Sequence, residues 1–244
     1  YFGYTYIMKI QGKTFVVTGA GGGIGAALVE GLLLRGARVA AVDVRTESLE
    51  ALQQKHADAS DKLSTHELNI TDKVAVEGFP TVVIQQHGCV DGIINCAGII
   101  QPFIRVNDLS YEAIDKVMGV NFYGTLYMTK TFLPHLLRRP EAHIVNVSSM
   151  GGFLPVPGQS VYGASKAAVK LLTEGLFAEL LETPVHVMVV FPGATQTDIT
   201  KNSQVEGPHV SDADTSKMSS MMLSADKVAA MILHGVEKNK PQVF

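Results

Sequence analysis

Short, almost continuously apolar runs alternate along the chain with longer segments whose apolar residues recur at helical spacing. Continuous apolar runs are typical of strands buried on both faces of a parallel sheet. The pattern therefore predicts an α/β fold: a doubly wound parallel sheet with helices on both faces, joined by right-handed crossovers. The predicted strands are residues 14–17, 38–42, 63–68, 92–94, 143–147 and 185–191.

The helical segments follow the predicted strands in turn. Gly36 suits the end of the first helix, because glycine tolerates the left-handed backbone found there, and Thr46 is a candidate N-cap of the second. Residues 240–244 look like the beginning of a further strand. The predicted helices are residues 24–35, 46–56, 73–87, 111–137, 160–181 and 225–238.

The length of 244 residues and the hydrophobic content of 46% are sufficient for one large core, so a single domain over residues 8–244 is predicted. Residues 1–7 are aromatic and lack the features of a signal peptide, which suggests a non-native leader before Met8. The end of the chain suggests a truncated tail. The long polar stretch 195–224 contains three methionines and is predicted to be a substrate-binding lid.

Charge and composition exclude several classes of partner. With 20 basic and 23 acidic residues the net charge is −3, so no nucleic-acid or anionic-lipid surface is expected. No apolar run approaches the ~20 residues that span a bilayer. Cys89 and Cys96 cannot form a framework of disulfides, which favours a cytoplasmic location. No histidine pair has ligand spacing with a carboxylate partner, so no metal site is predicted.

A glycine-rich loop, GAGGGIG at residues 19–25, lies between the first predicted strand and its helix. Free N–H groups at a helix start suit the pyrophosphate of a dinucleotide. Asp43 ends the second strand, where a carboxylate can accept hydrogen bonds from ribose hydroxyls and would repel a 2′-phosphate. This favours NAD over NADP, although Arg45 lies nearby. The alternatives are a tight turn without ligand and an aspartate that only ends a strand.

Tyr162 and Lys166 are spaced i, i+4 and share one face of a predicted helix. A tyrosine used as an acid or base near neutrality needs its pKa lowered by ~3 units, of which an adjacent ammonium can supply ~1 to 3. A bound oxidised nicotinamide could supply the remainder. Ser149 follows a strand and could hydrogen-bond a substrate oxygen, with Ser148 as a competing candidate. An exposed helix pair is the alternative for Tyr162 and Lys166.

In combination, these motifs resemble the short-chain dehydrogenases/reductases. The glycine loop, Asn95-Cys-Ala-Gly98, Asn121, Ser149, Tyr162 with Lys166, and Pro192-Gly193 occur in that family's order over residues 13–238. The resemblance implies a Rossmann fold, Tyr162 as acid/base, Lys166 lowering its pKa and holding the nicotinamide ribose, and Ser149 orienting the substrate. It also implies that Asn121 holds a water of a proton relay.

The resemblance implies a set of cofactor contacts in addition to Tyr162 and Lys166. Two positions depart from the family pattern: Cys96 replaces a frequent asparagine and Asn69 a frequent aspartate. The implied cofactor-binding residues are Gly19, Gly21, Gly22, Gly23, Ile24, Gly25, Asp43, Asn69, Ile70, Asn95, Ala97, Gly98, Pro192, Gly193, Thr195 and Thr197.

The combined features predict hydride transfer between NAD and a secondary alcohol or ketone. Apolar residues near the expected pocket favour a steroid-like, fatty or aromatic substrate. A non-catalytic NAD-binding sensor or scaffold is one alternative, and an NADP-dependent 3-oxoacyl thioester reductase is another. The resemblance also implies a homodimer or homotetramer formed through helices 111–137 and 160–181. The expected pocket residues are Ile100, Phe103, Met150, Phe153, Leu154, Val156 and residues 218–223.

Overall fold

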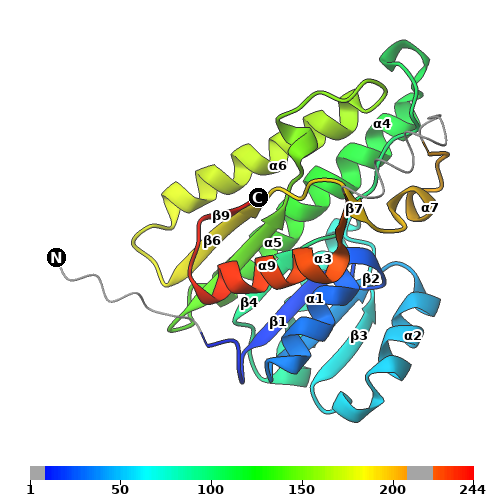
Figure 1. Ribbon diagram of the computed structural model, residues 1–244. Coiled ribbons are helices and arrows are strands. Elements are labelled where there is room, and N and C mark those ends of the chain that lie inside the picture. Colours follow the sequence, from blue (N-terminus) through cyan, green and yellow to red (C-terminus); the bar gives the residue numbers. More distant parts are fainter. Residues whose placement is uncertain (1–8, 208–221) are drawn as a thin grey trace.

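The predicted α/β architecture is present in the computed structural model, which describes residues 9–207 and 222–244 (Figure 1). Seven parallel strands form one sheet in the order β3-β2-β1-β4-β5-β6-β9. The order reverses direction between β1 and β4, as in a doubly wound sheet. The strands are β1 (Thr14–Thr18), β2 (Arg38–Asp43), β3 (Leu63–Glu67), β4 (Gly92–Asn95), β5 (Ala142–Val147), β6 (Val185–Val190) and β9 (Gln242–Val243).

Helices cover both faces of the sheet and bury two separate hydrophobic clusters. One face packs on α1, α2 and α9, which lie together in Figure 1, and the other on α3, α5 and α6. Adjacent residues of β1 point into opposite clusters, with Val16 on one side and Val17 on the other. The continuous apolar strands follow from this double coverage. The helices are α1 (Gly23–Leu34), α2 (Thr46–Lys55), α3 (Lys73–His87), α4 (Tyr111–Met118), α5 (Thr125–Leu136), α6 (Ser160–Glu179) and α9 (Ala225–Glu237).

Two local predictions require correction. The single helix predicted over residues 111–137 is interrupted by a π-helical turn, η3 (Gly119–Gly124), between α4 and α5. Gly124 packs closely against Ile70 in this turn, because a Cβ on Gly124 would lie 2.6 Å from Cδ1 of Ile70. Thr46 is not an N-cap: Arg45 occupies that position, and the Thr46 hydroxyl donates to Glu67 on β3. The prediction for Gly36 is confirmed, because it follows α1 with φ +76°.

Parts of the predicted lid are ordered elements. A short parallel pair, β7 (Thr195–Gln196) and β8 (Leu223–Ser224), brackets it, and α7 (Ile199–Ser203) lies between them. Met218 and Met221, like the leader at residues 1–7, fall outside the described residues. No helix in the described part of the chain is long and apolar enough to cross a membrane.

Two histidines near β3 make the stability of the fold depend on pH. Oγ of Ser64 lies 2.7 Å from Nε2 of both His66 and His87. Burial, followed by repulsion from His87, lowers the pKa of His66 to about 4, and burial lowers the pKa of His87. Since the native state disfavours protonation of these rings, the unfolded state binds more protons at mildly acidic pH.

We therefore expect the free energy of unfolding to be highest above pH ~6.5 and to fall between pH ~6.5 and ~4. Urea unfolding at pH 7 and pH 5 measures this difference. The variant His66→Gln should reduce it, whereas His234→Gln, at an exposed position on α9, should not. An unchanged difference in His66→Gln would contradict the assignment.

Candidate active site

A cavity of about 990 Å³ lies at the carboxyl ends of the strands, where the order of the sheet reverses. This is the position at which open α/β sheets bind ligands. The glycine loop, the end of β2, the loops after β4 and β5, the start of α6 and α7 all contribute to its lining. The predicted cofactor residues that line it are Gly19, Gly22, Gly23, Ile24, Gly25, Asp43, Asn69, Ile70, Ala97, Gly98, Tyr162, Lys166, Pro192, Gly193, Thr195 and Thr197.

The glycine loop requires its glycines for close packing. A Cβ on Gly25 would lie 2.0 Å from the carbonyl oxygen of Gly19, and one on Gly19 would lie 2.8 Å from Cα of Ala97. Gly22 precedes α1, whose N-terminus has no side-chain cap. The backbone there is open to the cavity, and uncapped N–H groups at a helix start favour an anionic group. The loop therefore fits the pyrophosphate of a dinucleotide.

Asp43 is buried beside this loop. One carboxylate oxygen accepts a 2.9 Å hydrogen bond from the N–H of Gly21, and the other accepts from the backbone N–H and Nε of Arg45, each at 3.1 Å. Gly21 does not line the cavity, and its contact with Asp43 orients the loop instead. Arg45 also donates to Asn202 on α7, so the end of β2 is joined to the segment that was predicted to be a lid.

Ser149, Tyr162 and Lys166 all line this cavity. Ser149 follows β5, and its hydroxyl oxygen accepts a 3.0 Å bond from the N–H of Gly151 and is hydrogen-bonded to the Tyr162 side chain. The neighbouring hydroxyl of Ser148 donates instead to the carbonyl of Lys166 at 2.7 Å. Of the two candidate serines, Ser149 is therefore the one that contacts the phenol.

Burial dominates the electrostatics of this cluster. It raises the pKa of Tyr162, and the hydrogen bond from Ser149 opposes the rise. Burial also lowers the pKa of Lys166, to about 8, and its Nζ donates to the carbonyl of Val147 at 2.9 Å. The prediction that Lys166 and a bound oxidised nicotinamide together lower the pKa of Tyr162 concerns the cofactor complex, and it stays a prediction.

Asn95 and Asn121, like Gly21, lie outside the cavity lining. Asn95 points into the core, where Nδ2 donates to Thr129 and Asn146, so its predicted cofactor contact is corrected to a structural role. Its place at the end of a buried strand explains this, because alternate residues face opposite sides of the sheet. Asn121 is also fully buried: its amide bonds both backbone groups of Ile99 and donates to Oγ of Ser165.

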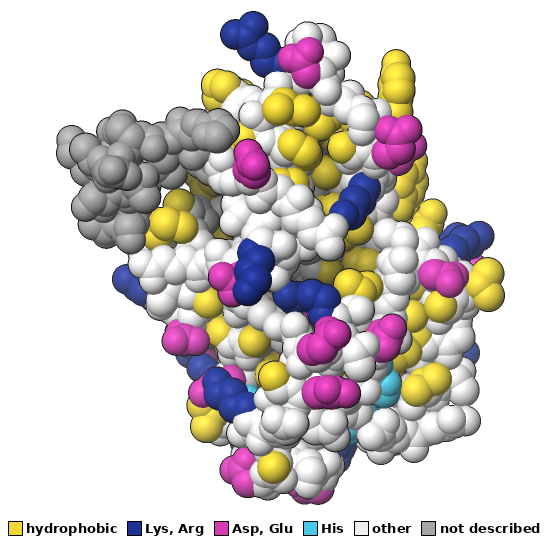
Figure 2. Space-filling view, turned by 90° about the vertical axis from the view of Figure 1, so that its right-hand side faces the viewer, with side chains coloured by type: hydrophobic (Ala, Val, Ile, Leu, Met, Phe, Trp, Pro, Cys, Tyr) yellow, Lys and Arg dark blue, Asp and Glu magenta, His cyan; other side chains and the backbone are white. Residues whose placement is uncertain are grey.

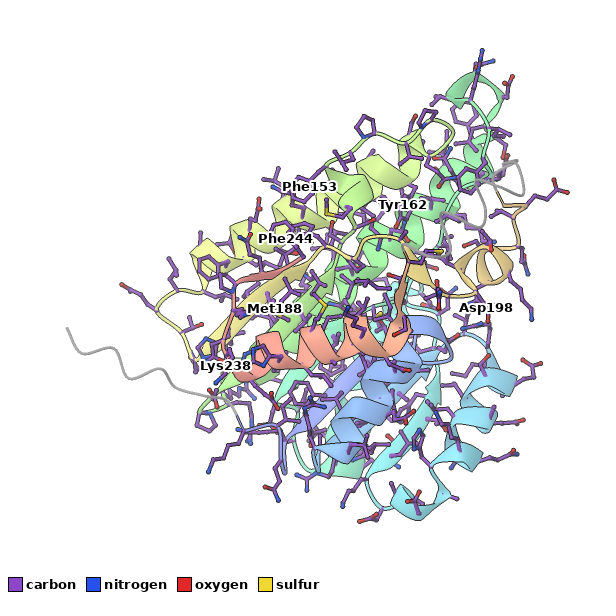
Figure 3. All side chains as sticks on the ribbon, in the orientation of Figure 1. Phe153, Tyr162, Met188, Asp198, Lys238 and Phe244 are labelled. Carbon is purple, nitrogen blue, oxygen red and sulfur yellow. The ribbon has the colours of Figure 1, made fainter. Side chains whose placement is uncertain are left out.

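Other side chains around the cavity refine the picture. Oδ1 of Asn69 accepts from the N–H and hydroxyl of Thr71, which shapes the turn after β3. Burial raises the pKa of the Cys96 thiol to about 12, so this thiol is neutral and a poor nucleophile. Phe153 does not line the cavity, contrary to the prediction; its ring packs against those of Phe191 and Phe244. Figure 3 shows Phe153 and Phe244 near each other.

Sequence reasoning missed Gln101, a fully buried residue in the loop after β4. Its Oε1 accepts hydrogen bonds from the backbone N–H groups of Val161 and Tyr162 at 2.8 and 3.0 Å. No motif identifies such a residue, because its partners are about sixty positions away and the contact exists only after the sheet has formed. It also missed Asn202, which has no signal within the polar stretch 195–224.

Among the described residues, no group of three or more His, Cys, Asp or Glu side chains is placed to hold a metal ion. The side chains that line the cavity include the hydroxyls of Ser149 and Tyr162 and the amine of Lys166. Groups of these types can donate or accept hydrogen bonds and protons.

The chain belongs to the short-chain dehydrogenase family, whose model matches residues 13–206, and it is therefore a member of a family of oxidoreductases. SadH from Mycobacterium tuberculosis is 33% identical over 239 residues, covering 96% of this chain and 86% of that protein. A protein named 3beta-hydroxysteroid dehydrogenase 2, from Eggerthella lenta, is 32% identical, with coverage of 78% and 74%.

The fold is also that of solved members of the family. A short-chain dehydrogenase/reductase from Burkholderia phymatum, determined in complex with NAD, superimposes with a TM-score of 0.87 at 24% identity. The match covers 97% of this chain and 90% of that one. At this level of identity the match shows a shared fold.

Proposed function

We propose that this chain transfers a hydride between NAD and a secondary alcohol or ketone, with Tyr162 as the acid/base. The observation that carries the proposal is that the hydrogen-bonded pair Ser149 and Tyr162, together with Lys166, lines the same cavity as the glycine loop. Cofactor site and proton-transfer group thus share one enclosed space. A pure binding protein would need only the first.

Each of these residues would have its own role in the reaction. When bound, the nicotinamide accepts the hydride in alcohol oxidation and supplies it in ketone reduction. Tyr162 takes the hydroxyl proton of the alcohol, or returns one to the ketone oxygen, while the Ser149 hydroxyl hydrogen-bonds that oxygen as its charge changes. Lys166 would hold the nicotinamide ribose. We propose that Asn121, which is bonded to Ile99 and Ser165, belongs to the proton relay.

Asp43 supports NAD as the preferred cofactor. Its carboxylate is buried at the end of β2, where a 2′-phosphate would meet a negative charge in a region of reduced dielectric. Arg45 could compensate that phosphate, but its guanidinium is engaged by Asp43 and Asn202. We therefore propose NAD, with NADP as the weaker alternative.

The cavity lining supports a hydrophobic substrate, such as a steroid-like, fatty or aromatic alcohol. Several large apolar side chains line the cavity, and an apolar lining disfavours a sugar, whose hydroxyls would lose their hydrogen bonds with water. The steroid dehydrogenase relative agrees with this class. The apolar lining residues are Ile100, Phe103, Met150, Leu154, Val156, Ile199 and Met222.

A panel of secondary alcohols and ketones assayed with NAD and NADP tests the proposal. We expect turnover of bulky apolar alcohols with NAD, followed at the absorbance of the reduced nicotinamide. Turnover restricted to 3-oxoacyl thioesters with NADP would instead favour the second candidate, which has a relative in Thermotoga maritima named 3-oxoacyl-[acyl-carrier-protein] reductase FabG, 34% identical over 194 residues.

Two observations disfavour that second candidate. The carboxylate of Asp43 opposes NADP, as argued above. Docking of an acidic carrier protein requires a basic surface, and on the face shown in Figure 2 basic side chains stand singly among acidic ones. The overall charge of −3 adds no attraction.

We also propose a homodimer or homotetramer. Large apolar side chains on α6 and next to it are exposed: Leu171 on α6 at 70%, and Leu181, two residues after the helix, at 66%. Tyr123, in the neighbouring η3 turn, is 47% exposed. Large exposed apolar side chains on packed helices favour a surface covered by a partner.

The variant Leu171→Asp is expected to shift the assembly toward monomer, because a buried unpaired carboxylate in the contact costs several kcal/mol (~3 to 5). Light scattering coupled to size exclusion measures the mass. Leu34→Asp is the matched control, since Leu34 is 81% exposed on α1, which lies on the opposite face of the sheet. A monomeric parent protein, or an unchanged mass in Leu171→Asp, would contradict the proposed interface.

A further inference from the structure

The N-terminus of α6, which contains Tyr162 in its first turn, lacks a local side-chain cap. The N–H groups of Val161 and Tyr162 are satisfied instead by Oε1 of Gln101. Capping from within the adjoining turn is the usual arrangement, because it costs no tertiary constraint. Here the cap comes from the loop that follows β4 and forms one wall of the cavity.

Gln101 uses both polar atoms of its side chain, and its backbone carbonyl, to hold the segment that leads into α6. Besides the two bonds that Oε1 accepts, Nε2 donates to the carbonyl of Gly158 at 2.8 Å, and the carbonyl of Gln101 accepts from Nε2 of Gln159 at 2.8 Å. Gln159 itself lines the cavity three residues before Tyr162. The side chain therefore fixes a continuous segment, residues 158–162, that borders the reacting groups.

The residues just before Gln101 are also anchored, each to a different element. Both backbone groups of Ile99 bond the amide of Asn121 in the η3 turn, and the N–H of Ile100 donates to Oγ of Ser203 on α7 at 2.9 Å. A Cβ on nearby Gly98 would lie 3.0 Å from Nζ of Lys166. The loop at residues 98–101 thus connects the proposed cofactor-binding side of the cavity with α7 and with α6, the helix that carries Tyr162.

We propose that Gln101 is a positioning residue: it fixes the position of the Tyr162 phenol relative to the cofactor-binding side of the cavity. This inference rests on the proposed function. Gln101 touches no reacting atom. Its action is geometric: the two N–H bonds fix the first turn of α6, and a displacement of about 1 Å at a reacting group can cost about a hundredfold in rate.

The test compares two variants of Gln101 in the full chain. Gln101→Met keeps the side-chain length and removes every side-chain hydrogen bond, and we expect kcat to fall about tenfold to a hundredfold with the Kd of NADH changed by less than about threefold. With its carboxyl group protonated, Gln101→Glu keeps an acceptor for the two N–H groups and a donor for the carbonyl of Gly158, so it should restore kcat to within about fivefold of the parent.

Ser110→Ala is the matched control for loss of a helix cap. Ser110 caps α4 by accepting from the N–H of Ala113 and lies in an exposed position. Both Ser110→Ala and Gln101→Met should lower the melting temperature, but only Gln101→Met should lower kcat. The proposal is overturned if kcat of folded Gln101→Met stays within about threefold of the parent, if Gln101→Glu does not restore it, or if the loss follows NADH affinity.

Hydrogen exchange provides a readout that needs no turnover. The amides of residues 158–163 should exchange faster in Gln101→Met than in the parent or in Gln101→Glu, while those of α9 stay unchanged. Equal exchange in the parent, Gln101→Met and Gln101→Glu would overturn the proposal. This holds even if Gln101→Met folds poorly. If the parent turns over no substrate, the proposed function fails on its own, and faster exchange would still support the contact between Gln101 and α6.

Discussion

Tyr162→Phe is expected to lower kcat by about a thousandfold while the Kd of NADH stays within about threefold of the parent. The phenol is the proton-transfer group that we propose; it lines the cavity, and its hydroxyl is hydrogen-bonded to Ser149. Removing one oxygen leaves the ring to pack as before. Turnover should therefore disappear without loss of the fold or of the cofactor site.

The comparison requires turnover by absorbance and NADH binding by fluorescence titration on the same preparations. Tyr111→Phe is the control, because Tyr111 is 82% exposed at the start of α4 and should tolerate the change without effect. Equal turnover in Tyr162→Phe and the parent would exclude Tyr162 as acid/base. A parent that binds NADH but turns over no member of the panel would favour a sensor or scaffold.

Asp43→Asn is expected to reduce the preference for NAD over NADP by about tenfold to a hundredfold, measured as the ratio of kcat/KM values. The amide can still accept the bond from the N–H of Gly21, so the glycine loop should retain its conformation. The negative charge facing a 2′-phosphate is removed. At the same time Arg45 loses its ion pair with Asp43 and becomes available to that phosphate.

Steady-state kinetics with both cofactors and one substrate measure this ratio. Glu47→Gln is the matched control, since it removes an exposed carboxylate from the first turn of α2 without facing the loop. A parent that prefers NADP would refute the role given to Asp43. An unchanged ratio in Asp43→Asn would assign the preference to other residues.

The parts of the fold and of the candidate site that could be predicted are those that depend on residues close together in the sequence. The strand at residues 14–17, the glycine loop and the helix of Tyr162 and Lys166 each depend on residues within one turn or one strand, and patterning reveals such elements. The π-helical turn at Asn121 was missed because the apolar spacing of α4 and α5 continues through it. Asn95 was misplaced because a motif does not show which way a side chain points.

The amino-acid sequence by itself determined the order of strands and helices along the chain and the glycine-rich turn. It also determined that Ser149 follows a strand and that Tyr162 and Lys166 lie near the start of a helix. Only the tertiary structure decided that Ser149 rather than Ser148 contacts the phenol, that burial dominates the pKa of Tyr162, and that Gln101 caps α6. The physical reason is the distance along the chain over which each interaction acts. Periodicity and local capping involve near neighbours, whereas desolvation and long-range hydrogen bonds arise only when distant segments pack together.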